Sequence, residues 1–149
     1  MKRLFLFVLF AISISFSTAF AGERGTPEEA KAMAEKAATY LKDNGFDKAC
    51  AAFHAKDGGF QDRDLYVTVQ DSKGNMACHG TIASLEGKNL LALKDVDGKA
   101  FNLEVQAIKD TGWVEFKWIN PVTKAVEPKR NYQIRVGEYV LGVGAYVTQ

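Results

Sequence analysis

The spacing of apolar residues along the chain changes near residue 64, from a helical period to alternation. Between residues 26 and 44 apolar side chains recur at helical spacing, and Thr26, Pro27 and Glu29 form the pattern of a capping box with proline at the first helical position. The helical period resumes over 46–54, after a glycine suited to ending a helix. The first third of the chain therefore predicts two consecutive helices.

From Asp64 onward the pattern is typical of strands. A strand over 65–70 and a partner strand over 75–80 flank a hairpin turn, and a mixed connection leads to a helix over 99–110. Three further strands are expected at 112–120, 129–137 and 139–147. The order αα–ββ–α–βββ predicts the α+β class, with N-terminal helices, one connecting helix and about five mostly antiparallel strands.

The first 21 residues have the form of a secretory signal peptide. Lys2 and Arg3 precede an almost wholly apolar run, and Ala19-Phe20-Ala21 matches a small-x-small cleavage site. We therefore predict cleavage after Ala21 and a periplasmic or secreted protein, with residues 22–149 as one domain. An uncleaved membrane anchor is the alternative, although the run is short for a span of about 20 residues.

The length and net charge of the chain limit the kinds of molecule that the protein is expected to bind. Cleavage would leave 128 residues, a size that suits one hydrophobic core. Without Lys2 and Arg3 the chain has 17 basic and 18 acidic residues, a net charge of −1 with histidine neutral. This balance gives no support for nucleic-acid binding or polybasic membrane attachment, and no membrane span is predicted in the mature chain.

The two cysteines, Cys50 and Cys78, are expected to form a disulfide, as a pair in an exported protein usually does. A redox-active thiol and a metal ligand are the alternatives, and neither cysteine lies in a C-x-x-C motif. His79 has no partner ligands at metal spacing, so we predict no metal site and no cofactor. Motifs of hydrolases, metalloproteases and phosphate loops are also missing, which predicts that the protein is not an enzyme.

The strand expected at 112–120 carries the most informative pattern. Alternation places one set of side chains on a common face: Val114, Phe116, Trp118 and Asn120. The next strand opens with Lys129 and Tyr132. Aromatic side chains, an amide and a cation brought together would suit a small pocket for an organic anion.

Short motifs spread over nearly all of the predicted mature chain share their order and spacing with a known family. They include Tyr40-Leu41-x3-Gly45, His79-Gly80, Gly112-Trp113-Val114, Trp118-x-Asn120-Pro121, Pro128-Lys129-x2-Tyr132 and Gly142-Val143-Gly144-x-Tyr146. In these features the chain resembles the single Cache domain, a PAS-like extracellular sensor domain of bacterial chemoreceptors and histidine kinases. The chain departs from the family pattern at Phe116, where a tyrosine is common, and at Cys78, where alanine is common.

The resemblance implies a PAS-like fold with a pocket between the sheet and its covering loops. The pocket would bind a short carboxylate such as acetate, propionate, lactate or pyruvate. The matching positions are Tyr66, His79, Phe116, Trp118, Lys129 and Tyr132. Asn120 is a further candidate, although it precedes a proline and can instead shape a turn.

Each candidate has a chemical role and a structural alternative. Lys129 would pair with the carboxylate, or it is an ordinary surface lysine. Trp118 and Phe116 would form an apolar wall, or they are ordinary core residues. The hydroxyl groups of Tyr66 and Tyr132 would donate to the anion or else lie at the surface. His79 would donate a hydrogen bond, or hold local structure.

Two hypotheses about function follow. In the first, the protein is a freestanding exported sensor domain that captures a small organic acid and presents the bound state to a membrane receptor or sensor kinase. In the second, it is a structural or protein-interaction module of the cell envelope, with its pocket filled by its own side chains. Either form is compatible with a homodimer.

Overall fold

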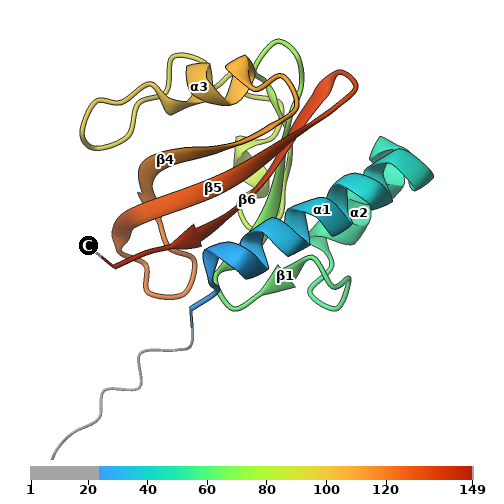
Figure 1. Ribbon diagram of the computed structural model, residues 1–149, viewed down its shortest axis with the longest axis horizontal. Helices are drawn as coiled ribbons and strands as arrows, with labels where there is room; N and C mark the ends of the chain where they lie inside the picture. The colour runs from blue at the N-terminus through green and yellow to red at the C-terminus, as the bar shows by residue number, and fades with distance from the viewer. Residues whose placement is uncertain (1–23, 149) are drawn as a thin grey trace, which may run out of the picture.

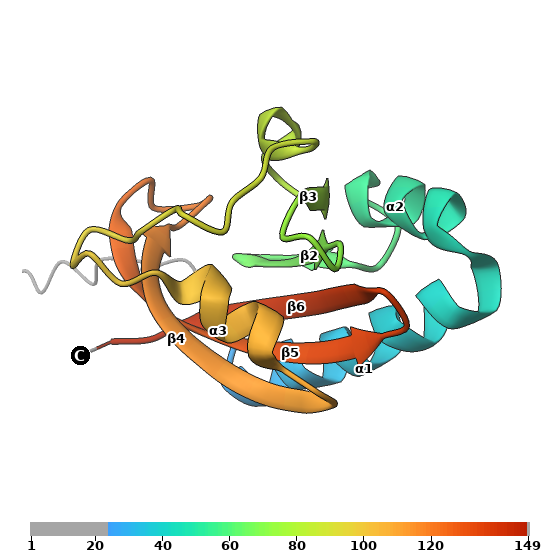
Figure 2. The same ribbon diagram turned by 90° about the horizontal axis from the view of Figure 1, so that it is seen from above.

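Helices cover both faces of an antiparallel sheet in the computed structural model, which describes residues 24–148 (Figures 1 and 2). The helix α1 (Pro27–Asn44) packs across β5 and β6 on one face, and α3 (Phe101–Ala107) packs on the other. The signal peptide predicted over 1–21 lies outside the described residues. Within the described part, none of the helices is both long and apolar enough to cross a bilayer.

Both N-terminal helices form as predicted because their ends are specified locally. The Thr26 hydroxyl accepts from the Glu29 backbone at 3.1 Å, and the Glu29 carboxylate accepts from the Thr26 backbone at 2.8 Å. Gly45, with a φ of 79°, separates α1 from α2 (Phe46–His54). The face of α1 that meets the sheet is built from small buried residues: Ala30, Ala34, Ala37 and Ala38. These alanines let the helix lie close to the strands.

The sheet has six strands, one more than expected. They are β1 (Gln61–Asp62), β2 (Leu65–Gln70), β3 (Met76–His79), β4 (Thr111–Ile119), β5 (Val126–Val136) and β6 (Tyr139–Tyr146). The order is β1-β2-β6-β5-β4, every pair is antiparallel, and β3 pairs with β2 as the predicted hairpin. The additional strand, β1, has only two residues, too few to show alternation in the sequence.

Two predicted boundaries differ from the observed ones. The third helix is shorter than the expected 99–110, because the Asp95 carboxylate accepts from the Lys99 backbone at 2.9 Å and holds that residue in a turn. The strand β5 begins three residues earlier than expected and includes Pro128. Its pairing with β6 ends at Lys129, so Pro128 lies where β5 is paired mainly on one side, which tolerates proline.

The predicted disulfide between Cys50 and Cys78 is confirmed, with an S–S distance of 2.00 Å. It joins α2 to β3 and so fixes the second helix against the edge of the sheet. The segment just before α1 is also fixed to the sheet, because the Gly25 backbone donates to the buried Asp64 carboxylate at 2.7 Å. Arg24 forms an ion pair with Glu127.

Candidate functional site

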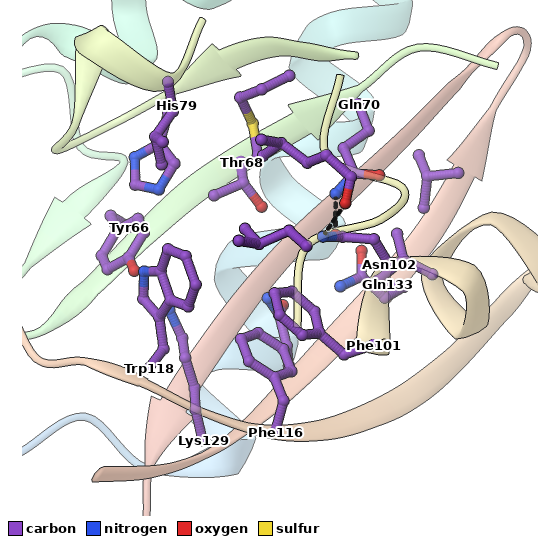
Figure 3. A pocket seen from close by; sticks show the side chains of 17 residues that line it. Tyr66, Thr68, Gln70, His79, Phe101, Asn102, Phe116, Trp118, Lys129 and Gln133 are labelled. Atoms are coloured by element: carbon purple, nitrogen blue, oxygen red, sulfur yellow. Dashed lines mark hydrogen bonds between the residues drawn. The ribbon is translucent and has the colours of Figure 1, made fainter. Parts of the chain in front are cut away.

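A cavity lies on the face of the sheet opposite α1, beneath α3 and the segment 85–93 (Figure 3). All strands except β1 contribute to its walls, together with α3. Its volume is about 40 Å³, which is small beside the roughly 300–1,000 Å³ of most small-molecule sites. The cavity therefore suits a ligand of few atoms.

Two glycines of β6 leave the space for this cavity. A Cβ atom at Gly144 would lie 2.4 Å from Lys129 Cε, and one at Gly142 would lie 2.4 Å from Gln133 Oε1. Neither position can carry a side chain unless the neighbouring side chain of β5 moves. The glycines thus let Lys129 and Gln133 extend across β6 into the interior.

The strand β5 contributes three polar side chains to the cavity. Lys129, Asn131 and Gln133 alternate along the strand, line the cavity and are almost completely buried. Asn131 Oδ1 is buried without a hydrogen-bond partner among the described residues. A polar row inside the protein is unusual unless it meets a ligand or water, because an unpaired buried polar atom costs about 1–3 kcal/mol.

Tyr132 is not part of the cavity, contrary to its predicted role. It is three residues from Lys129, so alternation turns it to the opposite face, toward α1. There its ring lies 4.9 Å from the Trp113 ring, and Lys31 Nζ lies 5.4 Å from its centroid. The side chain is part of the helix–sheet core.

Lys129 is a buried cation held by aromatic rings. Its Nζ lies 3.9 Å from the Tyr66 ring centroid and 4.8 Å from that of Tyr146, and the residue is 2% exposed. Within residues 24–148 it has no ion pair with a carboxylate. A desolvated cation–π contact contributes about 2 kcal/mol or more, and burying a charge costs several kcal/mol. An anion in the cavity would add an attraction to this charge that the rings do not supply.

His79 is a neutral hydrogen-bond donor beside this cation. Its ring lies 5.1 Å from the Tyr66 ring, and Nδ1 accepts from the backbone of Ile82 at 3.0 Å and of Thr81 at 3.3 Å. These two bonds assign the proton to Nε2. Burial, reinforced by the charge of Lys129, lowers the pKa of His79 to about 3. The ring thus presents an uncharged N–H at the cavity.

The hydroxyl groups of Tyr66 and Tyr146 are hydrogen-bonded to each other. Tyr146 donates to the carbonyl of Ile119 at 2.6 Å, and the two hydroxyl oxygens are 3.2 Å apart. Because the Tyr146 proton is already used, Tyr66 donates to Tyr146. Burial next to Tyr66 also raises the pKa of Tyr146, which keeps it protonated. Tyr66 therefore offers Lys129 its ring face, whereas the sequence suggested a hydroxyl donor to the ligand.

An aromatic wall closes the cavity on the β4 side. Phe116 stacks on Phe101 with ring centroids 4.0 Å apart, and the Trp118 ring meets the Phe101 ring edge-on at 5.7 Å. The shared face predicted for Phe116 and Trp118 thus lines the cavity, together with Phe101 of α3. Trp118 lines the cavity, and within the described part of the chain its indole N–H makes no hydrogen bond.

Amide side chains form the other end of the cavity (Figure 3). Gln70 donates to Asn102 at 2.6 Å and accepts from Gln106 at 3.0 Å, while Asn102 donates to the carbonyl of Leu90 at 2.8 Å. Sequence reasoning missed these residues and, in the polar row of β5, Asn131 and Gln133. Polar residues at alternate strand positions usually face water, so only their burial reveals them.

Asn120 also lies outside the cavity. It is fully buried at the end of β4, where its Nδ2 donates to Asp64 at 3.1 Å and to Glu127 at 3.0 Å. Its Oδ1 accepts from the backbone of Val122 at 2.8 Å. Asn120 therefore shapes the turn before β5, which was the alternative to a role in ligand binding. The structure thus brings together five of the seven candidates: Tyr66, His79, Phe116, Trp118 and Lys129.

The low pKa of His79 has a consequence for stability in acid. In the unfolded chain a histidine titrates near pH 6.5, so between about pH 3 and 6.5 the unfolded state binds one more proton than the folded state. This group therefore lowers the free energy of unfolding as the pH falls, by up to about 1.4 kcal/mol per pH unit. We expect His79→Gln to make stability less pH-dependent between pH 6.5 and 4, as measured by urea unfolding. Because the wild type and the variant have the same carboxylates, the difference between their slopes of unfolding free energy against pH reports on His79. Equal slopes would contradict the expectation.

Comparison with known proteins gives matches of the same architecture. The family model described as Single Cache domain 2 matches residues 16–149. A methyl-accepting chemotaxis protein from Vibrio parahaemolyticus is 30% identical, with 80% of this chain and 86% of that chain covered and a TM-score of 0.70. A periplasmic sensor domain of a chemotaxis protein is 23% identical, with 81% and 90% covered and a TM-score of 0.63. No curated protein matches the chain significantly.

A third similar structure is a Cache chemosensory domain studied for its recognition of carboxylic acids. It is 22% identical, with 81% of this chain and 88% of that chain covered and a TM-score of 0.61. At this identity, as for the periplasmic domain, the likeness shows the fold alone.

Proposed function

The chain belongs to the single Cache domain 2 family, and we propose from this premise that it is an exported, periplasmic sensor domain for a short organic acid. The family is one of ligand-sensing domains rather than enzymes, and the solved relatives are sensor domains of chemotaxis receptors. That the present chain is itself without catalytic activity is part of the proposal. Acetate, propionate, lactate and pyruvate are the ligands we consider.

The buried charge of Lys129, which forms no ion pair among residues 24–148, is the observation that carries this proposal. A carboxylate in the cavity would supply the missing negative charge, and His79 Nε2 and the Trp118 indole would donate to its oxygens. The wall of Phe101 and Phe116 would contact the short carbon chain. Asn131 Oδ1 would accept from a hydroxyl group, which only a hydroxy acid such as lactate offers.

The segment 85–93 supports a role in signalling. Leu85, Leu90 and Leu93 line the cavity from this segment, which has little regular secondary structure. Closure of the segment over a bound anion would change the surface around it, and a membrane receptor or sensor kinase would read that change. The proposal places the partner outside this chain and leaves a homodimer compatible with it.

A panel of small acids tests the proposal by thermal unfolding. Acetate and propionate are expected to raise the midpoint, since a ligand at 100 times its dissociation constant adds about 2.7 kcal/mol to the free energy of unfolding. Hexanoate is expected to have no effect, because the cavity holds only a few atoms. The matched control is acetamide, which has nearly the shape of acetate without its charge.

Two results would contradict the proposal. Equal stabilisation by acetate and acetamide would show that charge does not select the ligand. No stabilisation by any of the acids named above would favour a cavity filled by its own side chains, as expected for an interaction module of the cell envelope.

A further inference from the structure

A second cluster of chemically active side chains lies behind the strand that carries His79. Cys50 and His54 are one helical turn apart on α2, Cys78 is on β3, and Glu86 follows the short 3-10 helix η1 (Ala83–Leu85). Two sulfurs, one imidazole nitrogen and one carboxylate oxygen from these residues all lie within 4.8 Å of one another. Four such atoms are a complete donor set for a tetrahedral metal ion.

We propose that this cluster is a redox-controlled metal site. When the Cys50–Cys78 disulfide is reduced, its two sulfurs bind one Zn²⁺ together with His54 Nε2 and Glu86 Oε1. An external dithiol supplies two electrons by thiol–disulfide exchange and leaves as its own disulfide. Each of the two thiols formed on this chain then releases one proton when its sulfur binds the ion.

The position of His54 already fits such a site. Its Nε2 lies 3.9 Å from the sulfur of Cys50 and 3.8 Å from that of Cys78. Zinc–sulfur and zinc–nitrogen bonds of about 2.3 and 2.0–2.1 Å place a sulfur and a nitrogen about 3.6 Å apart in a tetrahedron. Two pairs of ligand atoms have to separate before an ion fits between them. One is the pair of sulfurs that the disulfide holds together, and the other is His54 Nε2 and Glu86 Oε1, which lie 2.6 Å apart, where a tetrahedral zinc site needs about 3.4 Å.

Glu86 is oriented by its surroundings. Its Oε1 lies 2.6 Å from His54 Nε2 and also accepts from the backbone of His79 at 2.8 Å. The bond from His79 comes from outside the donor set and orients the carboxylate before the metal arrives. The contact with His54 joins two ligand atoms and is replaced when the ion binds. The cavity uses neither His54 nor Glu86, so the cluster is separate from the proposed acid site.

Oxidation is expected to abolish the site. The sulfurs of a disulfide carry no thiolate charge, which leaves His54 and Glu86 as two ligands, too few for a stable tetrahedral zinc site. The reduced cluster, with two sulfurs, one nitrogen and one oxygen, suits Zn²⁺. The His54 side chain is 39% exposed and Cys50 is half-buried, whereas Cys78 is fully buried, so ion and reductant approach the cluster from the side of His54 and Cys50.

Cobalt is a visible probe of this site. The protein is reduced with dithiothreitol, desalted without oxygen and titrated with Co²⁺. We expect the absorption bands of tetrahedral Co²⁺ and a thiolate charge-transfer band to saturate at one equivalent, and added Zn²⁺ to remove them. The oxidised protein is expected to show neither band. A reduced wild type without the charge-transfer band would overturn the proposal.

Variants separate the complete site from two free thiols. His54→Ala and Glu86→Gln keep both cysteines and are each expected to weaken Co²⁺ binding about tenfold or more. Glu35→Gln, an exposed acidic residue on α1, is the matched control and should bind like the wild type. Equal affinity in all four proteins would overturn the proposal. If reduction alone abolishes the folded circular dichroism spectrum, Zn²⁺ must restore it, and failure to do so would also overturn it.

Discussion

Replacing Lys129 with methionine is expected to abolish most of the affinity for short carboxylates without harming the fold. A hydrogen bond to a charged group contributes about 1.5–3 kcal/mol, so we expect acetate and propionate to bind about 100-fold more weakly. The unliganded variant should be at least as stable as the wild type, because methionine fills similar space and removes a buried charge that has no carboxylate partner in the described part of the chain. Titration calorimetry and urea unfolding measure the two effects.

The matched control for this experiment is Lys48→Met, which removes an exposed lysine on α2. It is expected to bind both acids as the wild type does. If Lys129→Met bound them with unchanged affinity, Lys129 would not be part of the binding site. If the unliganded variant were instead less stable, Lys129 would stabilise the fold through its aromatic contacts alone, without a bound anion.

Removing the disulfide is expected to produce the largest loss of stability. The bridge links residues 28 apart, and the chain-entropy relation gives about 3–4 kcal/mol for a loop of this length. The double variant Cys50→Ala, Cys78→Ala should therefore unfold at a lower urea concentration than the oxidised wild type. It should remain folded without denaturant, because domains of this size have stabilities of about 5–15 kcal/mol.

The reduced wild type provides the control for this measurement. In the presence of a chelator it should unfold near the midpoint of the double variant, since both lack the bridge and bound metal. A loss below about 1 kcal/mol would contradict the expectation, because it would mean that contacts between α2 and β3 hold the loop without the bridge.

Local signals explain which parts of the fold were predictable. The two N-terminal helices were correct because Thr26, Pro27 and Gly45 specify their ends within a few residues. The start of β5 was wrong because a proline usually excludes a strand, and only the pairing register shows that Pro128 lies where β6 stops. The strand β1 exists only through its pairing with β2 and has no pattern of its own.

The candidate site was predictable where alternation decides which way a side chain points. Phe116 and Trp118 share a face because they are two residues apart, and that face lines the cavity. The same rule separates Tyr132 from Lys129, which are three apart, although one short motif contains both. Asn131 and Gln133 were missed because a strand with polar residues on one face ordinarily turns that face to water.

The sequence by itself determined the period of each segment, the ends of the first two helices, the aromatic face of β4 and the family resemblance. These properties depend on residues that are only a few positions apart in the sequence. The tertiary structure alone decided that β5 is covered on both faces, that Lys129 is buried among aromatic rings, and that His54 and Glu86 meet the two cysteines. Those relations join residues that are far apart in the chain, and only the packing of helices against the sheet brings them within contact.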